Sequence, residues 1–230
     1  MEHIQYGILF SGGLGFTTHS DKQVDSLIIL MKNYPMFYVG IQAEGREWVK
    51  MFSRGALSKL DYLATDAMTF TDEKGRRNRI YLKNETWLDD ENKFMDYYVR
   101  IIVGILNEEP IDIYVNPTYL PEIIAARYDK LWTDKRMDEV ISAAKINGIA
   151  IEINNRYMIP SAKFINKAKA AGIKFTVGTN NRDLNFSGAQ YARSMISKCG
   201  LVEKDFFLPP MKNGKKIGNL TYNAKWRMKQ

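Results

Sequence analysis

Apolar positions along the chain alternate between the spacing of helices and the continuous runs of buried strands. Apolar residues recur every three or four positions in five segments, which predicts helices around 24–31, 94–105, 137–144, 164–171 and 192–199. Short apolar runs between turn residues predict strands at 6–10, 36–43, 60–65, 111–115, 149–153 and 174–177. Because strands and helices alternate, we expect an α/β protein whose parallel strands are joined by right-handed crossovers.

Glycines support this order and narrow the choice of fold. Gly148, Gly172 and Gly200 each follow a helical stretch, where a left-handed residue commonly ends the helix. The first loop, Gly12-Gly13-Leu14-Gly15, does not have the glycine spacing of a dinucleotide-binding sheet. We therefore predict a TIM-like (β/α) barrel rather than an open sheet, formed by a single domain over residues 1–210.

Composition places the chain among ordinary globular proteins. Of its 230 residues, 45% are hydrophobic and 26% charged, which argues against a disordered or collagen-like chain. The single cysteine excludes an internal disulfide, and two histidines are too few for a zinc site built on several imidazoles. No apolar run is long enough for a membrane span, and the N-terminus lacks the pattern of a signal peptide. We expect a cytoplasmic protein, with export left open if the natural chain begins earlier.

The net charge of +7 is concentrated at the C-terminus. Residues 211–230 contain six Lys or Arg residues and no Asp or Glu, so we treat them as a basic tail. A solvated tail and a nucleic-acid contact through counterion release are both consistent with this charge. Because the rest of the chain carries no nucleic-acid-binding motif, we do not expect a nucleic-acid partner.

Polar side chains stand where most of the predicted strands end. They are Glu44 and Arg46, Asp66, Asn116, Glu152 with Asn154 and Arg156, and Asn180 with Asn181. In an α/β barrel the C-terminal strand ends meet at one rim, which carries the functional groups. Polar loops alone explain any one of these residues, but they explain less well a set rich in Asn and Arg. We therefore expect these side chains to share one pocket.

The residue types suggest roles in that pocket. Glu44 and Asp66 can act as a catalytic acid and base or bind a divalent cation. His19, in the loop after the first predicted strand, is a further candidate metal ligand, although an exposed loop histidine is the simpler interpretation. Arg46 and Arg156 suit an anion, and the asparagines suit hydroxyl groups. The predicted ligand is a small anionic or polyhydroxyl molecule, which Asn116, Asn154, Asn180 and Asn181 would bind together with the two arginines.

Residues 36–209 resemble the polymerase and histidinol phosphatase (PHP) family of metal-dependent hydrolases. The segment 147–154 is similar to the family's Glu-x-Asn strand, and 171–181 is similar to its Gly-Ser-Asp-Ala-His segment. Leu60-Asp61-Tyr62-Leu63 resembles the strand before a ligand histidine, and Val115-Asn116-Pro117 resembles a His-Pro step. The resemblance implies a distorted β/α barrel, phosphoesterase-like activity and a bridging metal ligand at Glu44.

The chain departs from the family pattern at the metal ligands. Met68, Asn116 and Arg182 stand where the family has histidines, and Asn180 replaces an aspartate. The opening His-x-His strand is missing, so either the chain starts at the second strand or the barrel is incomplete. The resemblance implies that Glu44, Asp66 and Asn154 line the pocket, without a three-metal centre.

Two functions follow as hypotheses. The first is a hydrolase of phosphorylated or otherwise anionic small molecules with a reduced site, in which Glu44, Asp66 and His19 hold one divalent ion (Mn, Zn or Mg) or none. The second is a non-catalytic binder of a sugar or carboxylate ligand on the same barrel. The oligomeric state is left open.

Overall fold

The computed structural model describes residues 20–33, 38–180 and 188–209. A sheet of five parallel strands forms its centre, in the order β1-β2-β5-β6-β7. These strands are β1 (Gly40–Ala43), β2 (Tyr62–Thr65), β5 (Ile113–Tyr114), β6 (Ala150–Asn154) and β7 (Phe175–Gly178). Each lies within or one residue beyond a predicted apolar run, so the α/β class and the parallel sheet are confirmed.

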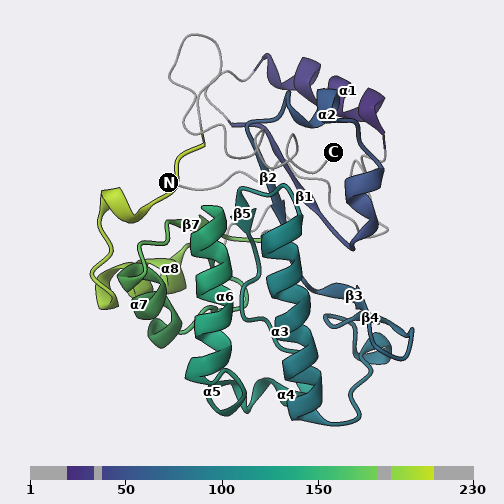
Figure 1. The fold of residues 1–230 in the computed structure, drawn as a ribbon. Coiled ribbons are helices and arrows are strands. Elements are labelled where there is room, and N and C mark those ends of the chain that lie inside the picture. Colours follow the sequence, from purple (N-terminus) through teal and green to yellow (C-terminus); the bar gives the residue numbers. More distant parts are fainter. Residues whose placement is uncertain (1–19, 34–37, 181–187, 210–230) are drawn as a thin grey trace.

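The five predicted helices are present. They are α1 (Asp21–Met31), α3 (Glu91–Glu108), α6 (Asp134–Asn147), α7 (Ala162–Ala170) and α8 (Gln190–Lys198). The helix α6 begins at Thr133, whose hydroxyl accepts the N–H of Arg136, and ends at left-handed Gly148 (φ 65°). In Figure 1, α3 and α6 lie side by side in front of the sheet, and the two helices are in contact.

Shorter elements connect these helices and strands. The single-turn α-helices are α2 (Arg54–Leu57), α4 (Glu122–Ala125) and α5 (Tyr128–Leu131). Three 3₁₀ turns cover Glu47–Lys50, Lys83–Glu85 and Glu203–Asp205. Across the described ranges, we find no helix that combines the length and the apolar character needed to cross a bilayer.

Alternate residues of the strands face two separate apolar clusters. The larger cluster joins one face of the sheet to the helices and includes Ile41, Leu63 and Ile151. The smaller cluster covers the opposite face and consists of Tyr62, Ala64, Ile113, Val115 and Ala150. Side chains alternate along a strand. Asp66, two residues after Ala64, and Glu152, two residues after Ala150, therefore lie on the same face as the smaller cluster, nearer the C-terminal edge.

The described strands form an open sheet rather than the closed ring that the sequence predicts. Strands β1 and β7 stand at its two ends, so barrel closure is not observed within residues 20–33, 38–180 and 188–209. Beside β7, the backbone N–H of Phe207 donates to the carbonyl of Phe175 at 2.8 Å. The predicted strand at 6–10 and the basic tail at 211–230 lie outside the described residues.

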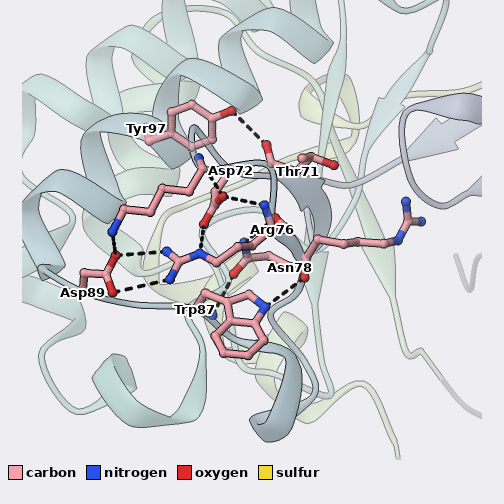
Figure 2. Close-up of polar contacts among 9 residues, drawn as sticks. Thr71, Asp72, Arg76, Asn78, Trp87, Asp89 and Tyr97 are labelled. Atoms are coloured by element: carbon pink, nitrogen blue, oxygen red, sulfur yellow. Dashed lines mark hydrogen bonds and ion pairs between the residues drawn. The ribbon is translucent and has the colours of Figure 1, made fainter.

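A small antiparallel hairpin extends from the sheet. It pairs β3 (Thr69–Thr71) with β4 (Arg77–Arg79) around a charged turn. Figure 2 shows how Arg76 bridges two carboxylates: its Nε donates to Asp72 Oδ2 at 2.7 Å, and its Nη2 donates to Asp89 Oδ2 at 3.0 Å. The guanidinium also lies over the ring of Trp87, 5.6 Å from its centroid.

Candidate functional site

Four polar side chains meet at the C-terminal edge of the central strands. Asp66 follows β2, Asn116 follows β5, and Glu152 and Asn154 belong to β6. Parallel neighbours bring these positions to one edge of the sheet, where α/β proteins place their ligand sites. The four residues, which we name the strand-end cluster, are buried, with exposed fractions of 5%, 4%, 1% and 0% respectively.

Asn116 is hydrogen-bonded to the other three residues of the cluster. Its side-chain amide donates to Asp66 Oδ2 at 2.8 Å, and its backbone N–H donates to Glu152 Oε2 at 2.7 Å. The amide of Asn154 donates to Asn116 Oδ1 at 2.9 Å and to Glu152 Oε2 at 3.0 Å. Asn116 adopts a left-handed backbone (φ 49°), a conformation that asparagine tolerates better than most residues. The turn after β5 therefore aims both its backbone and its side chain at the two carboxyl groups.

Burial shifts both carboxyl groups toward the protonated form. Desolvation raises the pKa of Glu152 to about 7, against the hydrogen bonds from Asn116 and Asn154, and the nearby charge of Asp66 adds to the increase. Desolvation also raises the pKa of Asp66, although the Met68 N–H, at 2.9 Å, and the Asn116 amide oppose it. A carboxyl group that titrates near neutrality can both donate and accept a proton. Such perturbed pairs are frequent at functional sites.

The neighbouring strand fits closely over Glu152. A Cβ atom at Gly178, on β7, would lie 1.6 Å from Glu152 Oε1, a distance that no side chain tolerates. Gly178 is the register partner of Asn154, so it stands at the same level of the sheet. The lack of a side chain at position 178 therefore leaves room for the Glu152 carboxyl group beside β7.

Glu44 lies at the margin of the cluster. Its Oε1 accepts hydrogen bonds from the hydroxyls of Thr69, at 2.6 Å, and Tyr81, at 2.5 Å. The negative charge of Glu44 contributes to the raised pKa of Asp66, which places the two predicted acidic residues near each other. The structure thus brings Asp66, Asn116 and Asn154 together, with Glu44 beside them.

Arg46 is engaged by groups of the protein itself. Its Nη1 pairs with Glu109 Oε1 at 2.6 Å, and its Nη2 donates to Thr65 Oγ1 at 3.1 Å and to the carbonyl of Asp66 at 2.5 Å. These bonds connect the loop after β1 to the end of β2. Arg46 thereby supports the backbone under Asp66, whereas the sequence predicted that it would hold an anionic ligand.

Arg156 and Asn180 lie at the outer rim of the edge. Arg156 is exposed, and its Nη1 donates to the carbonyl of Asn180 at 3.4 Å. Asn180 follows β7 in a left-handed conformation (φ 50°). The guanidinium of Arg156 is thus placed where a ligand could reach it from solvent. The other two predicted site residues, Asn181 and His19, lie outside the described residues.

Glu152 is a strand-end residue to which the sequence pattern assigned no role. The signal was present, because Glu152 is the only charged residue within the apolar strand Ala-Ile-Glu-Ile-Asn. An ionisable group inside a strand that is buried on both faces requires specific partners. One of those partners, Asn154, is two positions away, but the other, Asn116, is 36 positions away along the chain.

The donor set of the strand-end cluster does not fit a zinc centre. Within the described residues, no three His, Cys, Asp or Glu side chains lie together as metal ligands would. The oxygens Asp66 Oδ2 and Glu152 Oε2 face amide N–H donors at 2.8 and 3.0 Å, and an N–H group cannot ligate a cation. Asn116 and Asn154 therefore satisfy the carboxyl groups in the positions that a metal ion would need.

Comparison with known proteins identifies the fold. No protein-family profile matches the chain, and no curated protein matches it in sequence. Histidinol phosphate phosphatase from Lactococcus lactis subsp. lactis Il1403, in a crystal structure complexed with zinc, L-histidinol and phosphate, aligns with a TM-score of 0.53 and 14% identity. The alignment covers 95% of this chain and 85% of the phosphatase.

A cryo-EM structure of archaeal ribonuclease P with mature tRNA aligns with a TM-score of 0.39 and 13% identity, over 86% of this chain and 87% of that chain. At 14% identity, the likeness to the phosphatase establishes the fold alone. The chain has a PHP-like α/β fold, similar to that of a histidinol phosphate phosphatase.

Proposed function

We propose that this chain is a phosphatase-like hydrolase that acts on a phosphorylated or otherwise anionic small molecule through a reduced site. The observation that carries this proposal is the pair of buried carboxyl groups, Asp66 and Glu152, at the C-terminal edge of a phosphatase-like fold. The pKa of Glu152, raised by burial to about 7, suits a group that must transfer protons at neutral pH.

The residues divide into two tasks. Glu152 would protonate the leaving group or activate water. Asn116, which donates hydrogen bonds to both Glu152 and Asp66, would keep the two carboxyl groups in place. Arg156, exposed at the rim beside Asn180, would attract the anionic group of the substrate, because a guanidinium recognises phosphate and carboxylate through paired donors. In this scheme the amides of the cluster take the place of metal ligands.

A measurement of turnover tests the proposal. We expect purified protein to hydrolyse members of a panel of phosphorylated sugars, amino alcohols and nucleosides, and Glu152→Gln to abolish this activity. Glu139→Gln, an exposed position on α6, is the matched control and should retain it. If no phosphate ester is hydrolysed, with or without added Mn²⁺ or Zn²⁺, the hydrolase proposal is wrong.

Non-catalytic binding of a sugar or carboxylate ligand is the second candidate. It is favoured by one observation: Asp66 and Glu152 already accept hydrogen bonds from protein amides, so the cluster is closed on itself. For this candidate we expect ligands from the same panel, or their unphosphorylated forms, to raise the melting temperature without being consumed. Failure of every sugar and carboxylate to stabilise the protein would remove it.

A further inference from the structure

A cavity lies next to the strand-end cluster, where the backbone N–H of Tyr157, a residue of its wall, donates to Asn154 Oδ1 at 2.9 Å. It has a volume of about 550 Å³ and is enclosed by the loops after β5 and β6, by α4 and α5, and by the start of α7 and one face of α8. Neither Asp66, Asn116, Glu152 nor Asn154 lines it. The volume falls within the range of small-molecule sites. This cavity, which we name the tyrosine pocket, is therefore a separate candidate binding site.

Four tyrosines form much of the wall of the tyrosine pocket. Two are fixed by hydrogen bonds: Tyr128, whose hydroxyl is bonded to Thr118 Oγ1 at 2.5 Å, and Tyr191, which donates to the carbonyl of Pro160 at 2.7 Å. The other two, Tyr119 and Tyr157, pack edge to face, with ring centroids 4.8 Å apart and an interplanar angle of 70°. Rings held at different angles provide preformed surfaces for a flat or cationic ligand.

The backbone at the mouth of the pocket indicates a constrained shape. Met158 adopts a left-handed conformation (φ 52°) and leaves 65% of its surface exposed. Both features are unfavourable for a methionine, because L side chains rarely adopt this conformation and water solvates the thioether poorly. Strained residues of this kind are concentrated at ligand sites. The conformation turns the loop that carries Tyr157 and Ile159 along the pocket wall.

Charge and aromatic character select among ligand types. Glu122, the first residue of α4, is exposed on the wall and makes no ion pair within the described part of the chain. Its charge acts on Tyr119, whose pKa is raised to about 12 mainly by burial and also by Tyr157 and Glu122. The negative faces of tyrosine rings attract cations and repel anions. The wall of the pocket thus combines a carboxylate with the Tyr119–Tyr157 pair of rings.

A competing charge, Lys198, stands at the end of α8. It is exposed, and a lysine ammonium at the end of a flexible stem can extend into water, away from an entering ligand. Glu122 is exposed as well, and its charge acts on Tyr119 in the wall. For a bound cation, the attraction of the four rings and the carboxylate therefore exceeds the repulsion from the single lysine.

We propose that the tyrosine pocket binds a small organic cation that carries an aromatic ring, with its amine between Glu122 and the Tyr119–Tyr157 pair. This inference does not depend on the hydrolase proposal, because no residue of the strand-end cluster lines the tyrosine pocket. The proposal predicts that, among ligands with the same aromatic ring, the pocket prefers those with a positive charge.

Three probes of equal ring size test the proposal: benzylamine, benzyl alcohol and benzoate, titrated by NMR into the full-length protein. We expect benzylamine to bind about tenfold more tightly than benzyl alcohol, from the combined ring and carboxylate terms, and benzoate to bind most weakly. Glu122→Gln should remove most of this preference, whereas Glu139→Gln on α6 should leave it unchanged.

A blocking variant shows where the probe binds. Ala125 is exposed on α4 and lines the pocket, whereas the exposed Ala126 beside it does not. Ala125→Trp should abolish benzylamine binding, and Ala126→Trp should preserve it. The proposal is overturned if benzoate binds as tightly as benzylamine, if Glu122→Gln keeps the preference for the amine, or if Ala125→Trp binds benzylamine normally.

Discussion

The β3–β4 hairpin and the strand-end cluster use the same carboxyl chemistry with opposite results. Beside the hairpin, Asp89 is exposed and accepts hydrogen bonds from Lys74 and Arg76 of the hairpin turn, which lower its pKa to about 2 (Figure 2). In the strand-end cluster, Glu152 is buried among amides, and desolvation raises its pKa to about 7. Both groups are well hydrogen-bonded, so bonding alone does not decide the charge.

The two pKa values differ because only Glu152 is desolvated and only Asp89 has cationic partners. Asp89 keeps its hydration and gains two positive partners, so its charged form is favoured. Glu152 loses water, and within the described residues the groups that shift its pKa include no cation. Exposed ion pairs such as those of Asp89 cost little to form and contribute little to stability. A buried carboxyl group without a cation costs stability, which is the reason to look for function there.

The largest expected effect comes from filling the space beside Glu152. We expect Gly178→Ala to destabilise the fold by about 3 kcal/mol, because its Cβ would displace the carboxyl group from an enclosed position. Chemical denaturation measures the change. Gly104→Ala on α3, where an added Cβ meets nothing within 4 Å, should instead be neutral or stabilising.

A double-mutant cycle makes this prediction specific. Glu152→Ala removes the oxygen that a Cβ at position 178 would meet, so Gly178→Ala should cost much less in that background. If the cost of Gly178→Ala is the same with and without Glu152, the close approach of β6 and β7 is not what requires the glycine.

Removing the central amide of the cluster should have the next largest effect. Asn116→Ala should cost about 2 kcal/mol, since it removes the buried hydrogen bonds that the Asn116 side chain makes to Asp66 Oδ2 and to the amide of Asn154. Thermal and urea unfolding measure this loss. Asn180→Ala is the matched control, because Asn180 has nearly the same left-handed backbone (φ 50°) but lies outside the cluster. Equal losses in the two variants would assign the effect to the backbone rather than to the hydrogen bonds.

The raised pKa of Glu152 predicts a pH dependence with a defined sign. The folded protein holds the Glu152 proton more tightly than the unfolded chain does. This contribution to stability is therefore complete below the ordinary glutamate pKa of 4.5 and disappears as the pH rises through about 7. Between pH 6 and pH 8 the loss should be about 1 kcal/mol. Glu152→Gln should unfold with a flatter pH profile than the wild type; a parallel profile would show that Glu152 titrates at its ordinary value.

The smallest expected effect belongs to the hairpin. Asp89→Asn removes two ion pairs but from an exposed carboxylate, so we expect only a slight decrease in stability at low salt. That decrease should vanish in high salt, where exposed charges are screened. The cluster variants should keep their effects in the same buffer. A hairpin effect that persists in high salt would mean that its charges are less exposed than the structure places them.

Secondary structure was predictable because it depends on short-range patterns. The five long helices and the five central strands lie where the apolar spacing places them, and left-handed Gly148, Gly172 and Gly200 follow three of those helices. Short elements such as α4 and α5, of four residues each, were missed, since four residues do not establish a helical period. Among the described strands the sheet is open, which differs from the predicted barrel, because closure depends on pairing between distant strands.

The candidate site was predictable only in part. Strand ends indicated that Asp66, Asn116 and Asn154 share one edge, since parallel strands align their C-termini. The pattern did not predict that Arg46 pairs with Glu109, which is 63 residues away. It also did not predict that the Glu152 carboxyl group lies against Gly178. The sequence alone determined the long helices, the central strands, their parallel arrangement and the residue types at the strand ends. Tertiary structure decided which of these groups lose water and which donors face them, because desolvation and hydrogen-bond geometry depend on segments that meet only when the chain folds.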